Sequence, residues 1–303
     1  MDLSIVIVSY NTKKLLVDCL TSVFTQTRDL DYEVIVVDNA STDSSVDSVN
    51  ELFINELKKK KNKLVNSLTR NKLIINKTNL GFAKANNQAL RQAQGEYVLL
   101  LNSDTKLVGN ALKKLVDFAK SKEELGVVGP KLLNPDGSPQ LSVASFFTLP
   151  KAFVWLLTGD RFLYSSLPQS HSVDWVMGAA LMVKKDVIDK VGLLDEKFFM
   201  YMEEVEWCYR IKKAGFEIWF YPGAEIFHLV RGGSPASWRG KQKAILNIYQ
   251  GLIYFYQKHF ASWQLPVLKL LLLTKAAGAW FLGALTGNKY LKETYAQAYK
   301  LVR

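Results

Sequence analysis

Three short polar segments contain the side chains best suited to binding a polar ligand or a metal ion. Each follows an apolar run, and they occupy residues 9–11, 38–43 and 102–104. Carboxylate and amide oxygens suit Mg²⁺ or Mn²⁺, and a carboxylate can also accept a hydrogen bond from a nucleobase or a ribose hydroxyl. Asn, Ser and Asp equally favour turns and helix caps, so each segment taken alone has two interpretations. The candidate ligands are Ser9, Tyr10, Asn11, Asp38, Asn102, Ser103 and Asp104.

Two later segments contain candidate catalytic groups. Glu203 and Glu204 stand beside Phe, Met and Trp residues. Partial desolvation there would raise the pKa of a carboxyl group and make its anion a stronger base. Acidic residues in the first turn of a helix also stabilise its dipole, which is the alternative interpretation. His228 and Arg231 lie next to Gly232-Gly233 and could contact a metal ion or a phosphate, although a lone histidine is more often structural.

A glycine-containing turn offers a further candidate site for an anion. Gly81 precedes a predicted helix over residues 82–93, which starts at Phe82 and carries Lys84 in its first turn. Backbone N–H groups at a helix start, together with a lysine, bind anions, but a glycine turn with a solvated lysine fits the same residues. The chain contains neither a P-loop nor a G-x-G-x-x-G segment, which disfavours a nicotinamide enzyme.

Apolar runs alternate with amphipathic segments through the first half of the chain. This order predicts βαβ units and a largely parallel sheet. Because the carboxyl ends of such strands meet at one edge of the sheet, we expect the three polar segments to converge on one crevice. The predicted strands are 3–9, 33–37, 72–75, 97–101, 126–133 and 175–183, and the predicted helices are 12–26, 43–57, 82–93 and 203–214.

Positive charge is concentrated in the C-terminal region. Residues 236–303 contain ten Lys or Arg and one acidic residue, which places +9 of the net charge of +11 there. Residues 263–285 are strongly apolar but interrupted by Pro266, Lys269 and Lys275, a pattern that favours an interfacial helix over a membrane-spanning one. We expect an anionic membrane surface as partner and no nucleic acid, because no nucleic-acid-binding motif is present. Alternatively, these helices pack on the rest of the chain or form a homodimer contact.

Taken in order, the motifs resemble those of glycosyltransferase family 2, the inverting enzymes with the GT-A fold, and in particular its rhamnosyltransferase-like branch. The resemblance covers about residues 1–235 and is specific because many short segments occur in the same order. These segments are Val8-Ser9-Tyr10-Asn11, residues 37–43, Asn79-Leu80-Gly81-Phe82-Ala83, Leu101-Asn102-Ser103-Asp104, residues 128–132, Asp136-Gly137, residues 191–196, Glu203-Glu204 and residues 228–234.

The resemblance implies an α/β protein of the GT-A fold, with a Rossmann-like, mostly parallel central sheet and flanking helices over residues 1–235. A basic, apolar, helical and membrane-associating segment would follow over residues 236–303. Asp104 and His228 would form the site of a divalent metal, Mg²⁺ or Mn²⁺, and Glu204 would deprotonate the acceptor hydroxyl. The nucleotide sugar would be bound by Ser9, Tyr10, Asn11, Asp38, Gly81, Phe82, Lys84, Asn102, Ser103 and Arg231.

The implied reaction moves a sugar, with rhamnose favoured, from a dTDP- or UDP-sugar to a lipid-linked or polysaccharide acceptor in bacterial surface glycan synthesis. We expect a cytoplasmic protein, bound peripherally to the inner face of the cell membrane. Two positions depart from the family pattern: Asn102 replaces the first Asp of D-x-D, and Glu204 replaces the Asp of a Glu-Asp pair, so Glu203 stays an alternative base. The alternatives are a degenerate transferase that only binds nucleotide sugar and a noncatalytic basic protein that binds membrane or nucleic acid.

Overall fold

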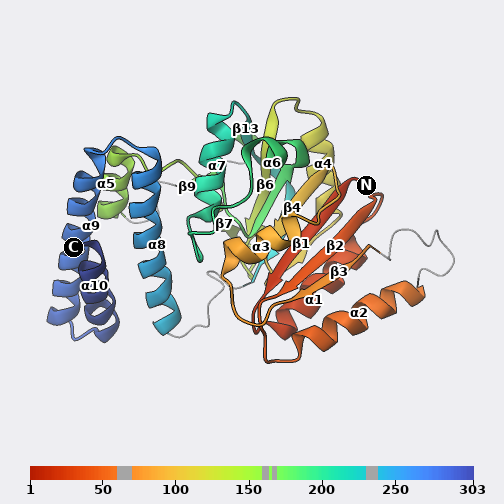
Figure 1. Ribbon diagram of the computed structural model, residues 1–303, viewed down its shortest axis with the longest axis horizontal. Helices are drawn as coiled ribbons and strands as arrows, with labels where there is room; N and C mark the ends of the chain where they lie inside the picture. Colours follow the sequence, from red (N-terminus) through yellow and green to blue (C-terminus); the bar gives the residue numbers. More distant parts are fainter. Residues whose placement is uncertain (60–69, 159–163, 166–168, 230–237) are drawn as a thin grey trace.

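The computed structural model describes residues 1–59, 70–158, 164–165, 169–229 and 238–303. These residues form an α/β structure in which a large twisted sheet lies beside a group of helices (Figure 1). The strands are β1 (Leu3–Ser9), β2 (Tyr32–Asp38), β3 (Lys72–Ile75), β4 (Tyr97–Leu101), β5 (Thr105–Leu107), β6 (Leu125–Leu133), β7 (Pro139–Gln140), β8 (Val143–Ala144), β9 (Tyr164–Ser165), β10 (His171–Ser172), β11 (Trp175–Val176), β12 (Ala180–Lys184) and β13 (Glu217–His228). The helices are α1 (Lys13–Gln26), α2 (Ser45–Lys59), α3 (Phe82–Leu90), α4 (Ala111–Lys120), α5 (Leu149–Thr158), α6 (Lys185–Val191), α7 (Glu203–Lys213), α8 (Trp238–His259), α9 (Gln264–Leu285) and α10 (Lys289–Val302).

Most of the long strands in the main sheet point the same way. The order along the sheet is β10-β13-β6-β12-β4-β1-β2-β3, with β5 paired to β13 and β7 paired to β6. β3, β2, β1 and β4 are successive parallel neighbours. β12 is antiparallel to both β4 and β6, so β6 and its parallel neighbour β13 keep the common direction. A separate sheet contains β11, β8 and β9.

Alternation of side chains along the central strands fills two hydrophobic cores. Val6, Ile35 and Leu100 lie in one core with α3, α6 and α7. Their chain neighbours Ile7 and Leu99 lie in the other core with α1, α2 and α4. Because successive residues of a strand point to opposite faces, a strand that is buried on both faces is apolar over most of its length. This explains why the sequence shows continuous apolar runs that end abruptly at polar residues. The buried polar residues Ser4 and Glu33, near the starts of β1 and β2, are bonded to each other at 2.7 Å.

The ends of the strands place the polar segments together. β1 pairs with β2 in a continuous register that runs from Leu3 opposite Tyr32 to Ser9 opposite Asp38. β4 lies on the other side of β1, in the same direction, and ends at Leu101. The segments that follow these three strands therefore leave the sheet at the same edge, as predicted.

One predicted strand is two strands in the structure. Residues 175–183 contribute β11 to the small sheet and most of β12 to the main sheet. The turn between them is held because Met177 donates its N–H to the carbonyl of Ser142, and Ala180 donates its N–H to the carbonyl of Met177. The predicted helices differ from the observed ones by at most three residues at either end.

The C-terminal helices extend one of the two hydrophobic cores. Buried residues of α8, α9 and α10 belong to the same core as those of α7, and Figure 1 shows these helices with α5 as one group beside the sheet. This packing is one of the alternatives that the sequence left open. The predicted boundary at residues 235 and 236 lies outside the described residues and stays a prediction.

α9 is much less covered than a core helix. Of the helices that the structure describes, it is the one that is long and apolar enough, by length and composition, to cross a membrane. Only 17% of its most apolar window of 18 residues is buried, whereas the core helix of a soluble protein is mostly buried. α9 therefore presents a long apolar surface that the rest of the described chain does not cover.

Candidate active site

The loops after β1 and β2 are joined by hydrogen bonds at the carboxyl edge of the sheet. Asn11 donates its backbone N–H to Ser41 Oγ at 2.9 Å, and its Oδ1 accepts the N–H of Thr42 at 2.7 Å. Asn39 donates its N–H to the carbonyl of Ser9 at 2.8 Å. The side chain of Asn11 therefore supports the second loop, and its predicted contact with a nucleotide sugar stays a prediction.

A row of hydroxyl groups connects the loop after β1 to the segment after β4. Ser9 Oγ lies 2.9 Å from Thr12 Oγ1, which lies 3.0 Å from Ser103 Oγ. Tyr10 stands next to this row with 49% of its surface exposed, so its ring is accessible to a ligand. The three polar segments predicted to converge thus form one connected site.

Asp38 is buried at the end of β2 and shows features of both interpretations. Its Oδ1 accepts the N–H of Ser41 at 2.8 Å, which is the turn contact. Its Oδ2 is buried and has no hydrogen-bond partner among the described residues. Since buried carboxylate oxygens are nearly always paired, this oxygen is suited to accept a hydrogen bond from a ligand.

Asn39 fastens the loop before α3 to the end of β2. Its Oδ1 accepts the N–H of Leu80 at 3.0 Å, and its Nδ2 donates to Asn79 Oδ1 at 2.9 Å. The side chain of Asn39 is itself buried, so these bonds form in a poorly solvated place where they are strong. The loop before α3 is therefore part of the same rigid edge.

The N–H groups of Gly81 and Phe82 are bonded within the chain, and the predicted contact of these two residues with a nucleotide sugar stays a prediction. Gly81 donates its N–H to Asn79 Oδ1 at 2.9 Å, and Phe82 donates its N–H to the carbonyl of Phe199 at 2.6 Å. Gly81 has a φ of 84°, and a Cβ there would lie 2.5 Å from that carbonyl oxygen, so the position requires glycine. Lys84 is exposed, and its predicted contact with phosphate stays a prediction.

Asp104 and His228 form the candidate metal site. Asp104 is buried three residues after the end of β4, and His228 is the last residue of β13. His228 Nε2 lies 3.4 Å from Asp104 Oδ1, and His228 Nδ1 lies 2.7 Å from Gln140 Oε1. With the amide oxygen as acceptor, His228 Nδ1 donates the hydrogen bond, and Nε2 on the other side of the ring faces the carboxylate.

The facing side chains of Asp104 and His228 suit a divalent cation. Asp104 Oδ2 and His228 Nε2 are both buried, and neither has a hydrogen-bond partner within the part of the chain that the structure describes. A buried carboxylate that faces a buried imidazole nitrogen, as Asp104 Oδ1 faces His228 Nε2, is unfavourable unless a cation or a proton lies between them. Imidazole and carboxylate are both ligands that Mn²⁺ accepts. Among the described residues, no group of three or more His, Cys, Asp or Glu is placed to hold a metal ion.

Glu203 and Glu204 begin α7 directly after a strained turn. Tyr201 and Met202 have φ values of 71° and 75°, a region that costs a non-glycine residue about 1–3 kcal/mol. Glu203 is 3% exposed, and Glu204 is less buried. The Oε2 atoms of both are buried and lack a hydrogen-bond partner among the residues described. Such strain and unpaired burial are typical of functional sites.

Burial raises the pKa of both carboxyl groups. Desolvation, and then the charge of Glu204, holds the pKa of Glu203 well above its ordinary value. Desolvation also raises the pKa of Glu204, against the lowering effect of backbone N–H groups that include those of Glu204 itself and Gly178. A raised pKa makes the anion a stronger base. Of the two carboxyl groups, that of Glu204 is better placed to reach a bound acceptor, because Glu204 is less buried than Glu203 and packs beside Gly178, which has no side chain.

Tyr201 connects the acidic pair to the candidate metal site. Burial raises the pKa of its hydroxyl to about 12, and the charges of Glu203, Glu204 and Asp104 add to this effect. Glu204 packs beside Gly178, and the next residue, Ala179, accepts the N–H of Asn102 at 2.9 Å, so α7 lies against the segment that carries Asp104. The segment after β4, the end of β13 and the start of α7 thus bring Asp104, His228 and Glu204 to one site.

The first part of the chain matches a known family. The profile described as "Glycosyl transferase family 2" matches residues 4–190, which is more than half of the chain. The chain belongs to glycosyl transferase family 2.

Relatives in this family include two bacterial rhamnosyltransferases. The chain is 26% identical over 216 residues to the N-acetylglucosaminyl-diphospho-decaprenol L-rhamnosyltransferase of Mycobacterium tuberculosis. That match covers 64% of this chain and 66% of the relative, just under two thirds of its length. The chain is also 26% identical over 161 residues to the rhamnosyltransferase WbbL of Escherichia coli, over 49% of this chain and 60% of that protein.

Solved structures of glycosyltransferases share the fold. The mannosyltransferase PcManGT from Pyrobaculum calidifontis, in complex with GDP-Man and Mn²⁺, aligns with a TM-score of 0.57 and 17% identity over 99% of this chain and 85% of that one. GalNAc-T7, with UDP, GalNAc and Mn²⁺, aligns with a TM-score of 0.58 and 18% identity over 84% of this chain and 50% of that one. The GT-A fold expected from the motifs is therefore confirmed.

Several residues that build the site were not found by sequence analysis. Gln140 orients His228 from 88 positions away, and no local pattern marks a glutamine for that purpose. Arg231 lies outside the described residues, so its predicted contact with phosphate stays a prediction. The residues missed are Thr12, Asn39, Gln140 and Tyr201. Asn39 lies within residues 37–43, one of the segments that resemble the family, so its place in the site could have been inferred from the sequence, though not its hydrogen bonds.

Replacing Gln140 by leucine should weaken the binding of Mn²⁺, because the Nδ1 proton of His228 then loses its acceptor and the ring its orientation. Loss of such a partner typically costs about 10- to 100-fold in metal affinity. Titration calorimetry with Mn²⁺ in the presence of UDP or dTDP measures this. Gln169→Leu, at an exposed position, is the matched control. Equal Mn²⁺ affinity in the two variants would contradict the role of Gln140 in orienting His228 toward the metal.

Proposed function

We propose that this protein is an inverting glycosyltransferase with a nucleoside diphosphate sugar as its donor. The observation that carries the proposal is that three buried atoms, Asp104 Oδ2, His228 Nε2 and Glu204 Oε2, are unpaired among the described residues and lie on segments that contact one another at the carboxyl edge of the sheet. The first two suit a cation and a diphosphate, and the third suits the removal of a proton. Membership of glycosyl transferase family 2 and the shared fold support the same conclusion.

Glu204 is the proposed base. Its carboxylate takes the proton from an acceptor hydroxyl as that oxygen attacks the anomeric carbon of the donor sugar. The new carbon–oxygen bond forms on the face opposite the bond to the diphosphate. The nucleoside diphosphate leaves with the electron pair of the broken bond, so the anomeric configuration inverts.

The leaving diphosphate gains negative charge as this bond breaks. A divalent cation, Mg²⁺ or Mn²⁺, would stabilise that charge when bound, and we assign Asp104 and His228 to hold it. Asn102 in place of an aspartate lowers the negative charge of the site and leaves Asp104 as its direct carboxylate ligand. The loops after β1 and β2 bind the nucleoside, with Asp38 Oδ2 as an acceptor for one of its donor groups.

The names of the relatives support rhamnose as the sugar. The mycobacterial and the Escherichia coli proteins are both named rhamnosyltransferases. The name of the first specifies a diphosphate-linked decaprenol, which supports a lipid-linked or polysaccharide acceptor and a place in bacterial surface glycan synthesis. dTDP-rhamnose is the first donor to test, and UDP-sugars are the second.

Exposed apolar side chains on α5 and α9 support attachment to a membrane. The two helices pack together, and Lys275 Nζ lies 3.5 Å from the ring centroid of Trp155. Residues 236–303, which include α9, also carry most of the net positive charge of the chain. Each basic residue near an anionic leaflet contributes about 1 kcal/mol to membrane binding. We place the protein in the cytoplasm, with α9 lying in the inner face of the cell membrane. The exposed side chains are Phe153, Val154, Leu157, Trp263, Val267, Leu270, Trp280, Phe281, Leu282 and Leu285.

Glu204→Gln should lower kcat about 10²- to 10⁴-fold, which is the usual contribution of a general base, and leave nucleotide affinity unchanged. Glu203→Gln is the matched control and should retain transfer. It should also raise the Tm at neutral pH, because the folded state holds this carboxyl at a raised pKa and ionisation in the unfolded state opposes folding. That gain should fade below the ordinary pKa of glutamic acid. Transfer assays with a panel of dTDP- and UDP-sugars, and calorimetric binding of UDP and dTDP, provide the measurements.

The opposite pattern, with transfer lost in Glu203→Gln and kept in Glu204→Gln, would move the base to Glu203. A product with retained anomeric configuration would exclude single displacement. Nucleotide binding with no transfer from any donor would favour the degenerate transferase, and membrane binding without nucleotide binding would favour the noncatalytic protein.

The triple variant Leu270→Gln, Phe281→Gln, Leu285→Gln should float poorly with vesicles of phosphatidylglycerol and phosphatidylcholine. Full burial of each apolar side chain is worth about 1.5–3 kcal/mol, so partial burial of three predicts at least about tenfold weaker partition. Ile54→Gln, Leu57→Gln, which removes exposed apolar side chains from α2, is the matched control. Equal flotation of the triple variant and the unaltered chain would exclude α9 as the membrane-binding face. If the unaltered chain floats equally well with vesicles that contain phosphatidylglycerol and with vesicles that lack it, the basic charge does not contribute to membrane binding.

A further inference from the structure

Helix α8 of the C-terminal region presses its backbone against the turn that precedes the acidic pair. Gly251 is buried on α8, and a Cβ added there would lie 2.8 Å from Met202 Cγ, 2.9 Å from Met202 Cβ and 3.4 Å from the carbonyl oxygen of Tyr201. Contacts below 3.0 Å are essentially never made by a real Cβ, so this approach depends on glycine. Tyr201 and Met202 are the two left-handed residues directly before Glu203. α8 therefore contacts the strained turn itself.

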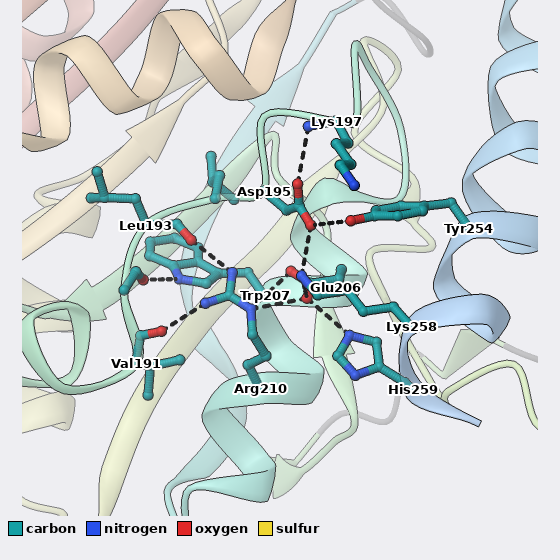
Figure 2. Close-up of polar contacts among 12 residues, drawn as sticks. Val191, Leu193, Asp195, Lys197, Glu206, Trp207, Arg210, Tyr254, Lys258 and His259 are labelled. Atoms are coloured by element: carbon teal, nitrogen blue, oxygen red, sulfur yellow. Dashed lines mark hydrogen bonds and ion pairs between the residues drawn. The ribbon is translucent and has the colours of Figure 1, made fainter. Parts of the chain in front are cut away.

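A buried carboxylate ties the end of α8 to the helix that carries the acidic pair (Figure 2). Glu206 lies on α7 two residues after Glu204 and is fully buried. Its Oε1 accepts from Lys258 Nζ at 2.8 Å and lies 2.9 Å from His259 Nε2, both at the end of α8. Arg210, one turn further along α7, donates its Nε to the same carboxylate at 2.9 Å. Removing one partner from such a buried charge is costly, so these bonds hold α7 and α8 in one orientation.

The same lysine also holds the loop that leads to the turn. Lys258 Nζ lies 2.6 Å from Asp195 Oδ2, which accepts the hydroxyl of Tyr254 at 2.8 Å. Arg210 donates to the carbonyl of Val191, the last residue of α6, at 2.8 Å and to the carbonyl of Leu193 in this loop at 2.7 Å. Through the contacts in Figure 2, α8 is bonded to the chain on both sides of the acidic pair: to Asp195 in the loop before it and to Glu206 on α7 after it.

These contacts exceed what simple apolar packing requires. Leu252 and Phe255 of α8 already lie in the shared hydrophobic core. The buried carboxylate of Glu206 and the close contact at Gly251 also fix the position of α8 relative to α7 and the turn. Hydrogen bonds and steric contacts do this because their energies change when atoms move by a few tenths of an ångström.

We propose that α8 is a positioning element for the base of the candidate active site. Gly251 sets the backbone of the turn, and Lys258 with His259 sets the direction of α7. None of the three contacts the substrate, since each acts through the placement of Glu204. The inference rests on the proposed function, in which Glu204 is the base.

Gly251→Ala in the full chain should lower kcat about 10- to 100-fold, the loss expected from a small misplacement of a catalytic group. The KM for the donor and the affinity for UDP or dTDP should stay within about twofold. Gly278→Ala on α9 is the matched control, because it makes the same change in helix propensity where no atom lies within 4 Å of the new Cβ. Amide hydrogen exchange of residues 199–206 should be faster in Gly251→Ala than in Gly278→Ala.

A second pair of variants tests the ionic contact. Lys258→Met should lower kcat in the same selective way, and Lys258→Arg should restore most of it, because arginine keeps the charge and the donors near Glu206 and Asp195. Equal kcat and equal exchange in Gly251→Ala and Gly278→Ala would overturn the proposal. A parallel loss of Tm, nucleotide affinity and kcat would also overturn it, since α8 would then only stabilise the fold. If the unaltered chain transfers no sugar, the proposed function fails, and the exchange of residues 199–206 alone decides whether α8 holds the turn.

Discussion

Burial of the central strands on both faces is the constraint on which the arrangement of the whole molecule depends. β1, β2 and β4 cannot carry exposed polar side chains along their length, because helices cover both sides of the sheet. The polar groups of the candidate site therefore lie where these strands end, whereas the buried Ser4 and Glu33 near the strand starts pair with each other. Since the strands are parallel, their ends share one edge, and the hydroxyl row from Ser9 to Ser103 joins them there. The site is a consequence of how the sheet is buried.

Helix α7 shows how one residue type serves two purposes in one short segment. Glu206 is fully buried and saturated by Lys258, His259 and Arg210, so its charge is compensated and it fixes the helix. Glu203 and Glu204, one turn earlier, each keep an oxygen without a partner among the described residues. Unpaired burial costs stability, so it persists where the unpaired atom has another use. The pairing of these carboxylates therefore distinguishes Glu206, which stabilises the fold, from Glu203 and Glu204, which are available for chemistry.

The C-terminal region has two different surfaces. α8 faces inward and contributes both apolar side chains and ionic contacts to the part of the molecule that holds the acidic pair. α9 faces outward with large apolar side chains that the described chain leaves exposed. An inward surface that orients α7 and an outward surface suited to lipid lie on adjacent helices of one group. The region is therefore continuous with the rest of the molecule, even though its composition sets it apart.

Local features of the sequence were enough to infer β1 to β4 and β6, the edge at which β1, β2 and β4 end and the polar residues gathered there, but not β13, which carries His228. Burial on both faces leaves a direct signature in consecutive residues, such as the apolar run before Asn102, and the ordered motifs pointed to the correct fold. The partners of these residues could not be inferred in the same way. Gln140 meets His228 across 88 positions, the N–H of Phe82 is taken by Phe199, and Gly251 meets Met202 from another helix. Each of these contacts depends on how two distant elements cross in space, and no periodicity within either element records that crossing. The sequence therefore marked Asp104 and Glu204 as candidate site residues, whereas the orientation of their side chains and their unpaired oxygens arose only when the elements packed together.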